Sequence, residues 1–468
     1  MKEQAPKRHY LSVFVLAMMN VAVVMSLRGL PIMAKEGLPM IFFLLFASLL
    51  FLVPVSLVSA ELATGWPEDG GVYRWVKEAF GADWGFAAIW LQWIQNVIWY
   101  PTVLAFAAGA LSYLFVDPSL ANSKIFNVVV ILIVYWGATF INFGGMKASG
   151  RLTTAGVLCG TIFPGLLVIA LGIVWLAMGK PVAFEATSHS ILPDFSNFDN
   201  IAFLAGVVLL FAGMEVGAVH VQDLKDPRGQ FPKSVFLAMF VIIAIFTLGS
   251  LAIAAVLPTQ QISLNAGLMQ AFRGMLGVFH LGWLLPVLGF LAAFGAIGGV
   301  TAWVAGPSKG LLATAKNGDL PPFLQRVNKK GVQTNILWVQ GLIVTAITLV
   351  YLLMPNVSSA FFLLTALTAI LYLIMYILLY SAAIALRFKR PDVPRTYRVP
   401  GGNAGMVIVA GLGMLAAAFA IVVGFFPPSQ LSVGSPVFYV AFLAAGTLLF
   451  IAAPFIIHRF KKPGWSQK

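Results

Sequence analysis

The sequence is poor in charge and in cysteine, and it lacks the motifs of common enzyme classes. Only 10% of its 468 residues are charged and 60% are hydrophobic, whereas soluble domains carry about 25% charged residues. No soluble core can bury so much apolar surface, so a soluble protein is excluded. The single cysteine, Cys159, excludes an internal disulfide and cysteine-rich metal sites. Because HExxH and clustered His and Asp residues are also missing, we expect no enzyme, no metal site and no cofactor.

Apolar stretches of about 20 residues, long enough to cross roughly 30 Å of hydrocarbon, recur along the whole chain. None alternates as the strands of a membrane barrel do. The pattern predicts an all-α polytopic membrane protein, with a single domain over 1–468. It has twelve transmembrane helices, expected at 10–34, 39–62, 86–115, 124–143, 153–178, 199–222, 233–257, 279–313, 334–354, 358–386, 403–426 and 436–458. The first run is too long for a cleaved signal peptide, so we expect it to be retained.

Basic residues are distributed unevenly between the two sides that these spans define. With a cytoplasmic N-terminus, 24 of the 29 lysines and arginines fall on the cytoplasmic side. The remaining five are Arg28, Lys35, Lys124, Lys180 and Arg273. The positive-inside rule therefore predicts a cell (inner or plasma) membrane protein with both termini in the cytoplasm.

The excess of basic residues on the cytoplasmic side accounts for the net charge of +13, so we infer no nucleic-acid partner from it. The expected surroundings of the protein are the lipid bilayer. The basic loop "RFKRPDVPRTYRVPGG" is expected either to contact anionic lipid headgroups or to act as a simple topology anchor.

Two of the expected spans carry an ionisable residue beside helix breakers. The first reads "SLRGLP" around Arg28, and the sixth reads "FAGMEVG" around Glu215. Ionisable groups inside a membrane are costly and therefore mark functional candidates. Freed backbone groups are tolerated only where they line a cavity, so two interrupted spans, five apart in order, predict an inverted-repeat transporter with its site at the breaks.

Purely structural roles are also possible for these two ionisable residues. Arg28 could extend to the nearby membrane surface, and Glu215 could serve as a structural hydrogen-bonding group. The two residues could also pair with each other. Further polar and aromatic residues that could line a site, although aromatic residues in spans more often serve packing, are Asn96, Trp99, Tyr100, Thr301, Tyr372 and Tyr376.

Three stretches resemble the amino acid–polyamine–organocation superfamily of transporters. They are "SAELATGWPEDGGVYRWVKEAFG" (59–81), "GMEVGAVHVQDLKDPRGQFPKS" (213–234) and "WVAGPSKGLLATAKNGDLPPFLQRVNKKGV" (303–332). Within the superfamily the chain looks most like the bacterial glutamate/GABA antiporters, particularly in "GPSKGLLATAKNGDLPP", "NKKGV" and "IFFLLFASLLFLVPVSLVSAELAT".

The resemblance implies a LeuT-type fold with two inverted five-helix repeats, 10–190 and 199–390, followed by helices 11 and 12 over 403–458. It implies a secondary transporter, an antiporter that exchanges a glutamate-like amino acid for a related one or for a decarboxylation product such as GABA. The alternative is an exchanger or proton-coupled permease for neutral or cationic amino acids or polyamines. Whether the protein is a monomer or a homodimer stays open. The substrate contacts carried over by the resemblance are Ser26, Leu27, Arg28, Gly29, Gly213, Met214, Glu215, Gly217 and Trp303.

The chain departs from the glutamate/GABA pattern at two points inside the membrane. A tyrosine- and acid-containing sequence is expected before the proline of span 1, where this chain has "SLRGLP". An acidic residue is expected in span 8 before Trp303, where this chain has Gly298, Gly299 and Val300.

At the two breaks we expect the substrate α-carboxylate to bind the amides of 26–29 and its ammonium to bind the carbonyls of 211–214. We expect Arg28 to bind either a substrate side-chain carboxylate or Glu215.

Overall fold

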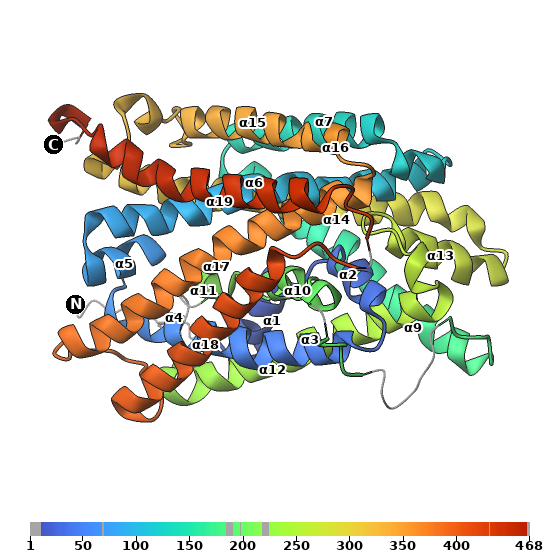
Figure 1. The fold of residues 1–468 in the computed structure, drawn as a ribbon, viewed down its shortest axis with the longest axis horizontal. Coiled ribbons are helices and arrows are strands. Elements are labelled where there is room, and N and C mark those ends of the chain that lie inside the picture. Colours follow the sequence, from blue (N-terminus) through green and yellow to red (C-terminus); the bar gives the residue numbers. More distant parts are fainter. Residues whose placement is uncertain are drawn as a thin grey trace, which may run out of the picture.

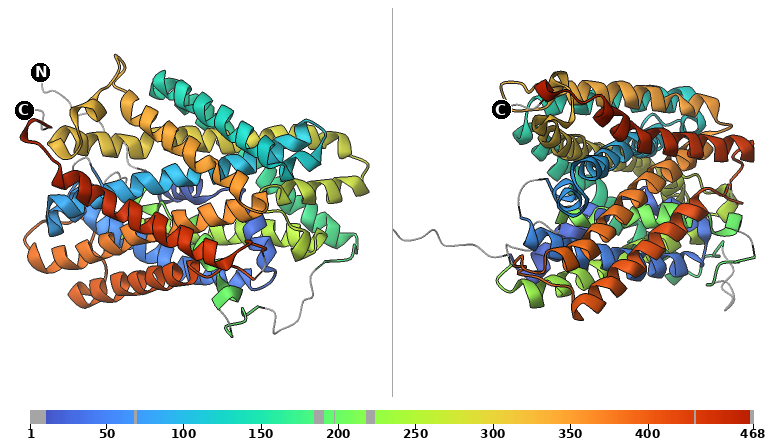
Figure 2. Two further views of the ribbon diagram at one scale, coloured as in Figure 1. Left: turned by 45° about the horizontal axis from the view of Figure 1, so that its top comes forward. Right: turned by 60° about the vertical axis from the view of Figure 1, so that its left-hand side comes forward.

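The computed structural model describes residues 11–67, 70–183, 191–196, 198–217, 224–429 and 431–465. Over these residues the chain consists of helices and loops, with no β-sheet, as predicted. Figures 1 and 2 show an elongated bundle in which most long helices run roughly along its length.

Ten helical segments of the described chain are long and apolar enough to cross a membrane. Three of the ten segments contain a π-helical stretch. A fourth segment consists of two consecutive helices. The ten are α3–η1–α4 (Met40–Ala47, Ser48–Leu52, Val53–Gly65), α6 (Ala82–Leu114), α7 (Lys124–Phe143), α8–η3–α9 (Met146–Ala155, Gly156–Ile162, Phe163–Ala177), α12 (Pro227–Val256), α14–η9 (Leu285–Thr314, Ala315–Asp319), α15–α16 (Thr334–Thr348, Val350–Leu353), α17 (Val357–Lys389), α18 (Gly402–Gly424) and α19 (Pro436–Arg459).

The two other expected spans, 10–34 and 199–222, are each divided into short pieces. The first contains α1 (Val13–Val24) and α2 (Gly29–Glu36), and the second contains α10 (Leu204–Leu210) and α11 (Met214–Gly217). Each piece alone is too short to cross the membrane. The described chain therefore shows ten of the twelve predicted spans as continuous apolar helices, and the other two are the segments in which breaks were expected. Residues 218–222 of the sixth span lie outside the described chain.

Two further helices lie in segments that were expected to be loops. These are α5 (Val72–Phe80) and α13 (Gly267–Val278), both amphipathic and too short to span a membrane. In α5, Tyr73 is buried and its hydroxyl donates to Oδ2 of Asp319 at 3.2 Å. Burial, together with the nearby carboxylate, raises the pKa of Tyr73 to about 12.

The centre of the bundle is formed by α6, which packs against α14 and α17. Most of α6 and α17 is buried inside the protein, whereas α19 is mostly exposed. Figure 1 shows α7 and α15 along one edge of the bundle and α12 along the opposite edge. Because exposed apolar side chains of the outer helices face the lipid, burial inside the protein identifies the central helices as those that can surround a site.

Two glycines let η3 and α14 approach at backbone distance. A Cβ placed on Gly160 would lie 2.2 Å from the backbone nitrogen of Gly295 and 2.3 Å from the carbonyl oxygen of Leu291. A Cβ placed on Gly295 would lie 2.4 Å from the carbonyl oxygen of Gly160. Small residues at such crossings are typical of membrane helices, because close backbone approach maximises van der Waals contact.

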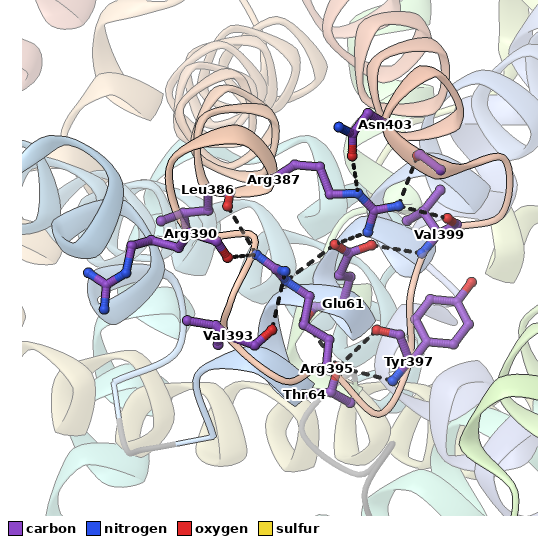
Figure 3. A network of polar contacts seen from close by, with 11 residues as sticks. Glu61, Thr64, Leu386, Arg387, Arg390, Val393, Arg395, Tyr397, Val399 and Asn403 are labelled. Atoms are coloured by element: carbon purple, nitrogen blue, oxygen red, sulfur yellow. Dashed lines mark hydrogen bonds and ion pairs between the residues drawn. The ribbon is translucent and has the colours of Figure 1, made fainter.

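A buried ion network joins the last turn of α4 to the end of α17 and to the loop that follows it (Figure 3). The Glu61 carboxylate accepts from the Arg387 guanidinium and from the backbone N–H of Val399 at 2.7 Å, and it forms an ion pair with Arg395, whose Nε lies 3.4 Å from Oε1. The three charged side chains are at most 5% exposed. Arg387 also donates to oxygens of Asn403, Val399 and Gly402.

This network concerns two arginines of the basic loop, and for the other basic residues of the loop contact with lipid headgroups stays a prediction. Arg395 and Arg387 are bound within the protein to Glu61 and to backbone carbonyls, so neither of them contacts lipid headgroups. Thr64 of α4 also contacts the loop, because its hydroxyl donates to the carbonyl of Tyr397 at 3.2 Å. The loop is therefore folded onto the end of α4.

Candidate functional site

The first break separates α1 from α2 and leaves consecutive amides unpaired. The N–H of Gly29 donates to the carbonyl of Ser26 at 3.0 Å. The amides of Ser26, Leu27 and Arg28 donate to no backbone carbonyl of the described chain. Free amides at the N-terminal end of a helix favour an anion, because the positive end of the helix dipole lies there.

The second break, at 211–213, separates α10 from α11, which begins at the buried Met214 and ends at Gly217. Gly213 has φ +110°, a conformation that glycine adopts without strain. Its N–H donates to the hydroxyl of Tyr376 at 2.8 Å. Glycine therefore accounts for this break, whereas Pro31 lies in the first turn of α2, where its missing N–H costs little.

A cavity of about 310 Å³ lies between the two breaks. Residues 25–28 of the first break, residue 212 of the second break and residues 209 and 210 at the end of α10 contribute to its wall. The helices α1, α6, α14 and α17, with η3, complete the wall. Its volume is within the range of about 300–1,000 Å³ that is typical of small-molecule sites.

Seven of the predicted residues line this cavity, and they come from four separate segments of the chain. They are Ser26, Leu27, Arg28, Asn96, Trp99, Trp303 and Tyr372. The eight predicted residues outside its wall are Gly29, Tyr100, Gly213, Met214, Glu215, Gly217, Thr301 and Tyr376.

Several residues outside the wall have structural contacts instead. Gly29 packs closely on another helix, since a Cβ there would lie 2.8 Å from Cδ1 of Leu210. The Tyr100 hydroxyl donates to the carbonyl of Trp303 at 2.8 Å, which joins α6 to α14. The Thr301 hydroxyl donates to a carbonyl of its own helix at 2.7 Å. These residues shape the site from behind its wall.

Glu215 is buried in a cage of three donors. Its Oε1 accepts from the Tyr372 hydroxyl at 2.6 Å and from Nε2 of Gln92 at 3.1 Å, and its Oε2 accepts from the Tyr376 hydroxyl. A buried carboxylate needs such donors because it has lost its water. Tyr372 also lines the cavity, so Glu215 is hydrogen-bonded to a residue of the cavity wall.

Arg28 is 2% exposed and contacts α6. Its Nη1 donates to Oγ1 of Thr102 at 3.0 Å, and its guanidinium carbon lies 5.5 Å from the ring centre of Trp99 and 6.0 Å from that of Phe361. Its Nε has no hydrogen-bond partner. It makes no ion pair with Glu215, nor with any other carboxylate of the described residues.

The remaining wall residues were not among the predicted site residues. Gln95 is the one with a signal in the sequence, since it is a polar residue of a span next to Asn96. The others are apolar or small, and nothing in the sequence separates them from ordinary packing residues: Met18, Val21, Val24, Met25, Val103, Phe106, Val157, Gly160, Thr161, Ile162, Leu209, Leu210, Ala212, Ala292, Gly295, Ala296 and Gly299.

The site offers amide donors, one guanidinium and aromatic faces, which suit a small ligand that carries a carboxylate. Within the described part of the chain, no three His, Cys, Asp or Glu side chains are grouped so that they could hold a metal ion. The arrangement is therefore one for binding an organic anion or zwitterion.

Known proteins resemble this chain along almost its full length. Residues 10–450 match the family described as amino acid permease. An uncharacterized transporter of Legionella pneumophila is 42% identical over 95% of this chain and 96% of its own length. A glutamate/gamma-aminobutyrate antiporter of Lactococcus lactis is 33% identical over 96% of this chain and 90% of its own length. A probable agmatine/putrescine antiporter of the same species is 28% identical over 78% and 77%, respectively.

The matched family and these relatives are membrane transporters rather than enzymes. The signature stretches around 59–81, 213–234 and 303–332 indicate the same family, and the ten apolar helices fit a multi-pass transporter. The chain belongs to the amino acid permease family of the amino acid–polyamine–organocation superfamily, and it is a membrane amino acid transporter.

Proposed function

We propose that the protein is a secondary antiporter that exchanges a glutamate-like amino acid for a related amino acid or for GABA. The observation that carries the proposal is the cavity between the two helix breaks, with three unpaired amides on one side. The name of the Lactococcus lactis relative supports the glutamate/GABA pair. Substrate binding would bias the equilibrium between outward- and inward-open states, which is how a carrier works by alternating access.

Each end of an amino acid has a partner at one of the breaks. The α-carboxylate accepts from the amides of Ser26, Leu27 and Arg28, which lie at the positive end of α2. The ammonium donates to carbonyl oxygens of 211–214, where Ala212 reaches the cavity wall. Trp99 and Trp303, whose ring centres are 6.0 Å apart, cover the apolar part of the substrate.

The proposal includes the topology expected from the sequence. The broken helices count as two interrupted spans, which gives twelve crossings with the ten continuous ones. Residues 10–190 and 199–390 form two inverted repeats, and 403–458 adds two helices outside them. Both termini face the cytoplasm of the cell membrane, consistent with 24 of 29 basic residues on that side.

Counterflow in proteoliposomes tests the proposal. Vesicles loaded with unlabelled glutamate are expected to accumulate labelled glutamate or GABA faster than empty vesicles, because exchange is faster than net transport in an antiporter. Uptake that ignores the preloaded substrate would refute antiport. Exchange restricted to neutral or cationic amino acids or polyamines would keep the carrier and refute the glutamate/GABA pair.

A further inference from the structure

Within the proposed exchange function, on which this inference rests, we propose that Arg28 binds the distal carboxylate of the substrate. Removal of the α-carboxyl group of glutamate as CO₂ leaves GABA, which keeps the ammonium and the distal carboxylate. A site that accepts both compounds must therefore recognise the distal carboxylate, because the α-carboxylate is absent from one of them. The cavity has one side chain suited to that task.

Arg28 carries the only charge among the described residues that line the cavity. No carboxylate of the described chain pairs with it, although its side chain is almost fully buried. A buried cation without a counter-ion is unfavourable unless a ligand supplies the missing charge. Nη1 donates to Thr102 and the buried Nε has no partner, so the protein does not saturate the guanidinium, which lines the cavity.

The surroundings of Arg28 fix the direction of these donors. Thr102 accepts from Nη1 and itself donates to the carbonyl of Trp99 at 2.8 Å, so the hydroxyl is oriented to act as acceptor. Trp99 and Phe361 contact the guanidinium as cation–π partners. The guanidinium is thereby held before the substrate arrives, and a planar fork suits bidentate binding of a carboxylate.

The site then has two separate anion subsites. The amides of 26–28 bind the α-carboxylate, and the Arg28 side chain, which extends to α6, binds the distal one. Glutamate occupies both subsites, whereas GABA occupies only the guanidinium. The positive charge also disfavours diamines such as those named for the agmatine/putrescine relative.

Four compounds separate the two subsites. Glutamine keeps only the α-carboxylate, isoglutamine and GABA keep only the distal one, and glutamate has both. Ligand-induced thermal stabilisation of the purified full-length protein gives a half-saturating concentration for each. In Arg28→Gln we expect that concentration to rise about 30-fold or more for glutamate, GABA and isoglutamine, and to change little for glutamine. Arg273→Gln, which alters an exposed arginine outside the cavity, is the matched control and should change none of them.

Two more conservative variants test the inference if Arg28→Gln does not fold. Arg28→Lys keeps the charge and loses the fork, and Thr102→Val removes the acceptor that holds the guanidinium; both should weaken the same three compounds by a smaller factor. An equal loss of glutamine would overturn the inference, because Arg28 would then bind the α-carboxylate or act structurally, and so would unchanged binding of all four. Absence of counterflow in the wild type, with this binding pattern intact, would reject the transport proposal and leave the Arg28 subsite standing.

Discussion

The buried Glu61 network predicts a large stability difference between two neighbouring arginines of one helix end. Arg387 is 5% exposed, and it donates to the Glu61 carboxylate and to oxygens of Asn403, Val399 and Gly402. Arg390, three residues later, is 47% exposed and pairs with Glu78 at 2.7 Å. Both arginines lie at the C-terminal end of α17 and each pairs with a glutamate, but they differ in burial.

Arg387→Gln is expected to lower the free energy of unfolding by about 3–5 kcal/mol, the usual cost of removing one member of a buried ion pair. The cost is high because Glu61 stays buried with less positive charge around it, while three acceptor oxygens lose their donor. Arg390→Gln removes an exposed pair, for which the expected loss is about 0–1 kcal/mol.

Equilibrium unfolding of the purified protein, in detergent micelles with increasing SDS, measures both variants on one scale. Glu61→Gln and the double variant Glu61→Gln/Arg387→Gln complete a double-mutant cycle, whose coupling should be at least about 1 kcal/mol in favour of the pair. Equal losses for Arg387→Gln and Arg390→Gln, or a coupling near zero, would refute the argument that burial makes this network structurally important.

Two other predictions concern packing and pH. Gly160→Ala should destabilise the protein in the same SDS assay and slow transport, because its Cβ meets backbone atoms of Gly295 and Leu291. Gly137→Ala is the control, because a Cβ there meets nothing within 4 Å. Equal behaviour of the two variants would contradict the close-contact interpretation. Because the pKa of Tyr73 is raised to about 12, its neutral form stabilises the fold fully below pH about 10, and that contribution is lost as the pH rises towards about 12. In Tyr73→Phe the stability should fall less over this interval, and an unchanged pH profile would argue against the effect.

Sequence patterns were informative where a residue is unusual for its surroundings. Arg28 and Glu215 are ionisable residues in apolar spans, and each lies within two residues of a glycine, so both breaks could be located from the sequence. The amphipathic α5 was not predicted, because its nine residues form no long apolar run. Local pattern therefore finds the spans and their interruptions, and it overlooks short amphipathic helices between them.

The partners of the ionisable residues could not be derived from the sequence. Arg28 contacts Thr102, 74 residues away, and Glu215 accepts from Tyr372, 157 residues away. Such pairs depend on how α6 and α17 pack around the breaks, and straight-helix arithmetic fails at a broken helix. For that reason pairing of Arg28 with Glu215 stayed open at the sequence level, whereas the structure gives each residue its own partners.

The separation of Glu61 from Arg387 along the chain also sets an order of assembly. The ribosome makes Arg387 326 residues after Glu61, which takes roughly 20–60 s at ordinary rates of synthesis. During that interval α4 is already made, while its carboxylate has neither of its guanidinium partners. The Glu61 network can therefore form only after α17 and the loop that follows it have been made, which makes it a late contact in the biogenesis of the protein.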